Sequence, residues 1–227
     1  MTQITYYGHS CFGVALAGKK LLFDPFIRPN ELARDIDPEQ IEADYILISH
    51  GHEDHIADAV DIAKRTGAMV ISNFEITTWL AAQGVENTRP MNTGGKFNTG
   101  FGLVKCVTAH HSSSFPDGSY AGNPMGFIIK SENKTFYYAG DTALTLDMQL
   151  IPELFTLDFV FFPIGDNFTM DADDAIKACD FVQCDDVIGM HYDTFGYIKI
   201  DHKEVLDKFE REGKILTLMK IGETIIK

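Results

Sequence analysis

The sequence has no long apolar run and little positive charge. No stretch of its 227 residues approaches the roughly 18 consecutive apolar residues of a transmembrane helix, so we expect no membrane partner. Met1 to Ile4 lead directly into a strand-like run without a signal-peptide pattern, so we expect a soluble, cytoplasmic protein. The formal net charge of −14 repels polyanions, and we therefore expect no nucleic acid as a partner.

Cysteine is scarce, and its spacing suggests neither disulfides nor a metal site. The four cysteines include no C-x-x-C pair, and the two at positions 11 and 106 lie in apolar runs, so we expect buried free thiols. A chain of this length and 45% apolar content can bury a core without disulfides. Because no linker or low-complexity segment interrupts it, we predict one domain over residues 1–227. The cysteines are Cys11, Cys106, Cys179 and Cys184.

Short strand-like runs alternate with helical patterns in both halves of the chain, and this periodicity predicts an α/β or α+β fold. Residues 29–40 are polar and are predicted to form a surface loop beside the site or a plain connector. The predicted strands are 4–7, 11–16, 20–23, 45–48, 69–71, 103–109, 125–130, 135–139, 158–163, 186–190, 215–219 and 223–226. The predicted helices are 55–66, 75–83, 144–155, 172–181 and 202–212.

One strand-like run, Tyr45–Ile48, leads into three histidines and an aspartate within six residues. Imidazole and carboxylate are ligands that zinc and similar divalent metals accept. His50 and His52 share strand parity and can point the same way, whereas Asp54 and His55 follow after the chain has turned toward a helix. This arrangement suits two metals better than one. For any single histidine, an ordinary surface residue on a strand-to-helix loop is the alternative.

This H-x-H-x-D-H motif resembles the signature of the metallo-β-lactamase superfamily. Other stretches are similar to the small bacterial metal-dependent hydrolases related to ascorbate-6-phosphate lactonase. The resemblance implies a four-layer αββα sandwich, in which two sheets pack face to face with helices outside and the halves are related by a pseudo-twofold axis. These stretches are Gly8-His9-Ser10, Asp24-Pro25-Phe26, Ala139-Gly140-Asp141-Thr142, residues 163–170 and Met190-His191-Tyr192.

The resemblance also implies ligands for two divalent ions, with zinc expected first and manganese allowed. His50, His52 and one of the neighbours His110 and His111 would hold the first ion, because adjacent strand residues point to opposite faces. The ligand in the resembling proteins directly precedes a serine-rich run, which favours His111 and leaves His110 as a buried or half-buried histidine. Asp54, His55 and His191 would hold the second ion. Asp141 would bridge both, and it can also cap a following helix.

The activity that the resemblance implies is hydrolysis of a small ester, lactone or phosphoester by a hydroxide that bridges two metals. Asp54, Asp141 and His9 are the candidate catalytic residues. His9 either contacts substrate or leaving group in the pocket, or is a structural turn residue. Asp24 either accepts a hydrogen bond from a ligand histidine or only forms a turn. The residues 166–167 are interpreted as a turn at the rim of the site.

Other functions stay open beside hydrolysis of a small molecule. A phosphodiesterase acting on nucleic acid, like the tRNA-processing relatives, would be expected to carry a basic arm, and this chain has none. A non-hydrolytic metal-binding or diiron redox protein is the other alternative, but flavodiiron relatives have a carboxylate at the place of His52 and an added flavin domain. Relatives that cleave β-lactams often use a cysteine ligand, and none of the four cysteines fits. The expected partner is a small-molecule substrate, and a homo-oligomer remains open.

Overall fold

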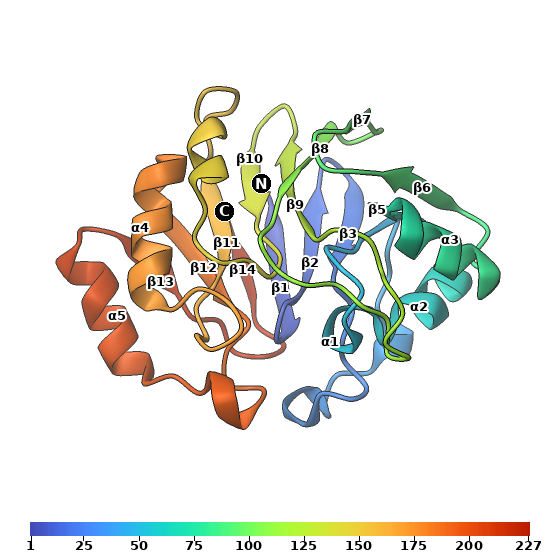
Figure 1. Cartoon of the computed structure of the whole chain (residues 1–227), viewed down its shortest axis with the longest axis horizontal. Coiled ribbons are helices and arrows are strands. Elements are labelled where there is room, and N and C mark those ends of the chain that lie inside the picture. The colour runs from blue at the N-terminus through green and yellow to red at the C-terminus, as the bar shows by residue number, and fades with distance from the viewer.

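The computed structural model describes residues 1–227 as two seven-stranded mixed sheets that pack face to face between two layers of helices (Figure 1). The predicted αββα sandwich is therefore confirmed. The first sheet has the strand order β14-β1-β2-β3-β4-β5-β6. Its strands are β1 (Gln3–Gly8), β2 (Cys11–Leu16), β3 (Lys19–Phe23), β4 (Tyr45–Leu47), β5 (Met69–Asn73), β6 (Thr88–Met91) and β14 (Thr224–Ile226).

The second sheet has the order β13-β12-β11-β10-β9-β8-β7. Its strands are β7 (Lys96–Asn98), β8 (Leu103–Thr108), β9 (Met125–Lys130), β10 (Thr135–Tyr138), β11 (Phe159–Pro163), β12 (Asp186–Met190) and β13 (Ile215–Thr217). In both sheets an antiparallel portion is followed by a parallel one, β3-β4-β5-β6 in the first and β10-β11-β12-β13 in the second. The two halves of the chain therefore repeat one construction, as the resemblance implied.

Helices cover the outer face of each sheet, as Figure 1 shows. On the first sheet lie α1 (Glu53–Ile56), α2 (Ala59–Thr66) and α3 (Phe74–Ala82). On the second lie α4 (Ala172–Val182) and α5 (His202–Arg211). None of these helices has the length and apolar composition that crossing a membrane requires.

Aromatic side chains fill the space between the two sheets. Phe23 of β3 stacks on Tyr138 of β10 with ring centroids 4.6 Å apart, and Phe12 of β2 meets Phe161 of β11 at 4.8 Å. All four side chains are fully buried. Such large rings bury much apolar area and hold the sheets in a defined position. This matters for the site, because its residues come from strand ends of both sheets.

Short segments differ from the sequence prediction for identifiable reasons. The predicted helix 144–155 is only a 3-10 turn, Leu146–Leu150, because Pro152 lacks the N–H that would continue the helical hydrogen bonds. The predicted helix 55–66 begins earlier and breaks at Asp58, whose carboxylate accepts the backbone N–H groups of Ile27 and Arg28. The strands β6 and β7 were not predicted. Both lie at sheet edges, where a residue such as Pro90 is tolerated.

Candidate metal centre

The first histidine cluster forms where β4 ends. His50 and His52 come from the loop between β4 and α1, and His111 follows β8 of the other sheet. His50 Nε2 lies 2.9 Å from His52 Nδ1, and the ligand atoms of all three residues lie within 4.8 Å of one another. Three imidazoles that converge in this way offer three nitrogen ligands and leave one position of a tetrahedral ion open.

The second cluster lies beside the first and combines the carboxylate of Asp54 with the imidazoles of the predicted ligands His55 and His191 and of the buried His9. Asp54 and His55 sit in the first turn of α1, and His191 directly follows β12. Asp54 Oδ2 lies 3.8 Å from the Nε2 atoms of both His55 and His191. Two segments far apart in the sequence thus bring a second set of candidate metal-ligand atoms together.

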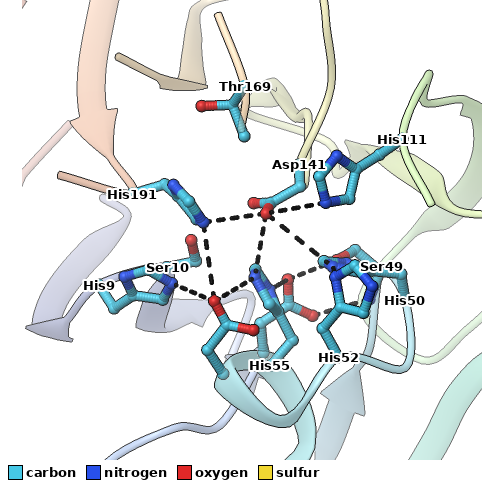
Figure 2. Close-up of polar contacts among 12 residues, drawn as sticks. His9, Ser10, Ser49, His50, His52, His55, His111, Asp141, Thr169 and His191 are labelled. Carbon is cyan, nitrogen blue, oxygen red and sulfur yellow. Dashed lines mark hydrogen bonds and ion pairs between the residues drawn. The ribbon is translucent and has the colours of Figure 1, made fainter. Parts of the chain in front are cut away.

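Asp141 lies between the two clusters, at the end of β10 (Figure 2). Its Oδ2 lies 3.9 Å from His50 Nε2 and 3.6 Å from His111 Nε2 on one side. On the other side it lies 3.4 Å from His55 Nε2 and 3.0 Å from His191 Nε2. No helix begins at Asp141, and Thr145 caps the turn that follows. The helix-cap alternative for Asp141 is therefore wrong.

Unpartnered buried atoms show that these residues suit cations. His55 Nε2 and Asp141 Oδ1 are buried and have no hydrogen-bond partner. A buried polar atom without a partner costs free energy, and such atoms in native structures call for a ligand, ion or water. Both atoms belong to the inward-facing ligand set, so the donor arrangement fits divalent metal ions.

Asp24 supports ligands of both clusters from beneath. Its Oδ2 accepts from His55 Nδ1 at 2.8 Å and from the Ser49 hydroxyl at 2.6 Å. Because that hydroxyl donates to Asp24, it accepts from His50 Nδ1 at 3.0 Å. Nδ1 of each histidine then carries a proton, so Nε2 is the nitrogen that would bind a metal. The hydroxyl of Tyr138 also donates to Asp24 Oδ2, at 2.8 Å. The predicted hydrogen bond between Asp24 and a candidate ligand histidine is present.

His9 is 1% exposed and does not itself line the cavity above the clusters, but it contacts Asp54 and His191, which do. Burial, followed by the charge of His191, lowers the pKa of His9 to about 4, so its ring is neutral. Its Nε2–H donates to Asp54 Oδ2 at 3.1 Å, and its Nδ1 accepts from the Thr194 hydroxyl at 2.9 Å. The structure places His9 where it orients Asp54. Its suggested contact with substrate or leaving group stays a prediction.

The backbone is strained where it turns these side chains into the site. His9, Asp24 and His191 have φ values of 57°, 42° and 56°, and each follows directly on a strand. Residues other than glycine rarely adopt this left-handed conformation, which costs about 1–3 kcal/mol and is concentrated at functional sites. Gly165 permits one of these turns, since a Cβ there would lie 2.1 Å from the His191 carbonyl oxygen.

The pKa values of the predicted ligand histidines are shifted in opposite directions in the two clusters. Burial lowers the pKa of each of His50, His52 and His111, so the first cluster is uncharged at neutral pH. Burial also acts against the charged form of His191, but the charge of Asp141 outweighs it and raises the pKa of His191 to about 9. The pKa of His55 is raised in the same way, against burial, by nearby carboxylates.

A cavity of about 330 Å³ opens above the two clusters. Phe168 and Phe195 form its apolar side. Phe168 belongs to the turn that starts at Asp166 and Asn167, both with positive φ, so the predicted turn lies at the rim of the cavity. The remaining lining residues are His52, Asp54, His111, Ser112, Asp141 and His191.

Comparison with known proteins agrees with this geometry. The family profile described as a beta-lactamase superfamily domain matches residues 3–191. A UPF0173 metal-dependent hydrolase of Flavobacterium johnsoniae is 53% identical over 223 residues, which cover 98% of this chain and 99% of the relative. The corresponding protein of Christiangramia forsetii is 54% identical over 224 residues, covering 98% and 99%. The chain belongs to the metallo-β-lactamase superfamily.

A solved structure of that superfamily has the same fold along nearly its whole length. Igni18, described as a novel metallo hydrolase from the archaeon Ignicoccus hospitalis, superposes with a TM-score of 0.88 at 35% identity. The superposition covers 99% of this chain and 97% of Igni18. Together with the relatives, this makes the chain a metal-dependent hydrolase of the metallo-β-lactamase superfamily.

The structure brings all the predicted ligand residues of the hydrolase into one place, and ligation itself stays a prediction. His111 turns toward Asp141, whereas His110 is exposed, so its expected half-buried position is wrong. None of the four cysteines joins the clusters, and all are free and buried. Sequence reasoning missed the supporting Ser49, Tyr138 and Thr194. Of these three residues, only Ser49 could have been suspected from the sequence, because it directly precedes His50.

Proposed function

We propose that the chain hydrolyses a small ester, lactone or phosphoester with a water molecule activated between two divalent ions. The observation that carries this proposal is the position of Asp141. Its Oδ2 lies within 3.9 Å of imidazole nitrogens from both clusters, and its Oδ1 is buried without a partner. A carboxylate in that position can be shared by two cations, and its charge offsets their mutual repulsion.

Each group of residues has its own part in this proposal. Two ions bound there would lower the pKa of water toward neutrality and polarise the carbonyl or phosphoryl oxygen of the substrate. His50, His52 and His111 would hold one ion, and Asp54, His55 and His191 the other. Asp24 and His9 would keep the ligand side chains in position through the hydrogen bonds described above. Zinc is the ion we expect first, and manganese would suit the same nitrogen and oxygen donors.

The expected substrate is a small molecule, not a nucleic acid. The cavity of about 330 Å³ has no lysine or arginine in its lining, and the whole chain carries a net charge of −14. Binding of nucleic acid depends largely on contacts between cationic side chains and phosphates. The site offers none of these contacts.

The test combines metal analysis with a hydrolysis screen. Chelated protein would be reloaded with zinc or with manganese and assayed on lactones, carboxylic esters, phosphodiesters and thioesters. We expect two ions per chain and hydrolysis of at least one ester, lactone or phosphoester that disappears on chelation and returns with metal. A maximum of one ion per chain after saturation, or hydrolysis that persists without metal, would contradict the proposal. His110→Ala is the matched control, because this exposed neighbour of His111 lies outside both clusters.

A further inference from the structure

We propose that the substrate is an uncharged ester or lactone with an apolar, preferably aromatic, group beside the reacting carbonyl. This inference rests on the hydrolytic function proposed above and narrows its substrate class. Its basis is the surface next to the clusters, which has aromatic rings and no cation.

The cavity above the clusters continues into a wider groove. The groove has a volume of about 780 Å³ and shares Asp54, Phe168 and Phe195 with the cavity. A substrate with its carbonyl at the clusters would therefore extend past the two phenylalanines into the groove. The other groove residues are Phe26, Pro29, Glu53, Thr194, Gly196 and Tyr197.

Exposed aromatic side chains line this path. Phe168 is 50% exposed and Tyr197 is 78% exposed, with ring centroids 6.2 Å apart and an edge-to-face arrangement. Phe195 is also exposed and packs its ring edge-on against His9 with centroids 5.4 Å apart. The rings come from two separate loops, between β11 and α4 and after β12. Exposed rings gathered beside a polar site mark a surface that binds an apolar group.

The same path has nothing that would hold an anion. No lysine or arginine lines the cavity or the groove, and Glu53 and Asp54 add negative charge there. Arg28 lies in the loop after β3, but its guanidinium already pairs with Asp58, Asp61 and Glu39. A phosphate or carboxylate in the groove would lose hydration without gaining a counter-ion. A substrate such as a sugar phosphate would thus be disfavoured at its distal end.

The test compares lactones that differ only in one substituent. The probes are γ-butyrolactone itself and its γ-benzyl, γ-phosphonooxymethyl and γ-trimethylammoniomethyl derivatives, each assayed with the metal-loaded protein. We expect the benzyl lactone to have the highest kcat/KM. Removing one ring, in Phe168→Ala or Tyr197→Ala, should lower the ratio of kcat/KM for the benzyl lactone to that for γ-butyrolactone by about tenfold.

A control variant and a binding measurement separate this inference from the proposed function. Phe74→Ala removes a ring whose exposed fraction, 61%, lies between those of Phe168 and Tyr197 but which is outside the cavity and the groove, and it should leave the ratio unchanged. NMR line broadening of the benzyl protons by metal-free protein should report binding without hydrolysis, and should be lost in Phe168→Ala and Tyr197→Ala.

The possible results of these experiments test the substrate class and the hydrolytic function separately. Preference for the phosphorylated or the trimethylammonium lactone would overturn the substrate class while leaving the hydrolytic function intact. Equal benzyl broadening in wild type and both ring variants would also overturn it. If the metal-loaded protein cleaves none of the lactones and none of the esters and phosphodiesters of the screen, the proposed function fails, and the substrate class fails with it.

Discussion

The two clusters lie side by side and share Asp141, yet they present different chemistry to a metal. The first has three imidazoles whose pKa values burial lowers, so they are neutral and ready to bind. The second has histidines whose pKa values are raised by carboxylates, that of His191 to about 9. Without metal, protons on these histidines balance the negative charge of Asp54 and Asp141. If the clusters bind two ions as we propose, the difference teaches that the second ion would compete with protons, whereas the first would not.

The largest effect is expected from removing the shared charge, in Asp141→Asn. Asparagine keeps the shape, but it offers one oxygen and no charge between two cations that repel each other. The first cluster keeps its three histidines and should retain an ion, while the second should empty. Turnover should then fall by roughly 10³-fold. Metal content, melting temperature and turnover of the purified variant check this. Near-normal turnover with two ions bound would show that Asp141 is not part of the metal centre.

His111→Ala should do the reverse and weaken the first cluster. It removes one of three nitrogen ligands, so metal content should fall toward one ion per chain, and turnover by about 10²-fold. His110→Ala is the matched control, since the neighbouring side chain is exposed and belongs to neither cluster. Elemental analysis of both variants is the measurement. Loss of metal from His110→Ala with retention in His111→Ala would show that the wrong histidine was chosen.

The affinities for the two ions should depend differently on pH, because only the second ion must displace protons. His191 is protonated below its pKa of about 9 and must lose that proton to bind a metal, so affinity for the second ion should rise with pH. For each proton released, the rise is about tenfold per pH unit between pH 6 and 8. The first ion should show almost no such dependence. Calorimetric titration at pH 7.5 in buffers of different ionisation enthalpy counts the protons. Equal release with both ions would refute the contrast between the clusters.

The part of the candidate metal centre that is contiguous in the chain could be predicted from the sequence alone. His50, His52, Asp54 and His55 follow one apolar strand, so their spacing alone indicated metal chemistry. His111, Asp141 and His191 depended on resemblance, because only the packing of two sheets brings these strand ends together. The layers of the sandwich were likewise implied by resemblance, since strand periodicity does not say which sheets meet.

Other features left no recognisable pattern in the sequence. Tyr138 stands in an apolar strand and looks like any core aromatic, yet its hydroxyl reaches Asp24 across the sheets. Phe168 lies in the loop between β11 and α4 and Tyr197 in a short 3-10 helix, and their positions beside the clusters follow from tertiary structure. The helix predicted over residues 144–155 does not form, because the prediction gave the spacing of apolar residues more weight than Pro152. The exposure of His110 follows from the turn after β8, which strand alternation does not describe.

The smallest effect is expected at Tyr138, which contacts no metal-ligand residue directly. Tyr138→Phe keeps the ring stacked on Phe23 but removes the hydroxyl that donates to Asp24 Oδ2 and to the Ser10 carbonyl, each at 2.8 Å. Asp24 then holds its partners less firmly. His55 contacts Asp24 directly and His50 only through Ser49, so affinity should fall by about tenfold for the second ion and less for the first. The free energy of unfolding should drop by about 1.5–3 kcal/mol, as for one buried hydrogen bond to a charged group. Tyr137→Phe on the same strand is the control, because its buried hydroxyl has no partner. Metal titration and denaturant unfolding of both variants measure these effects. Equal losses for both ions would mean that Asp24 supports the two clusters alike.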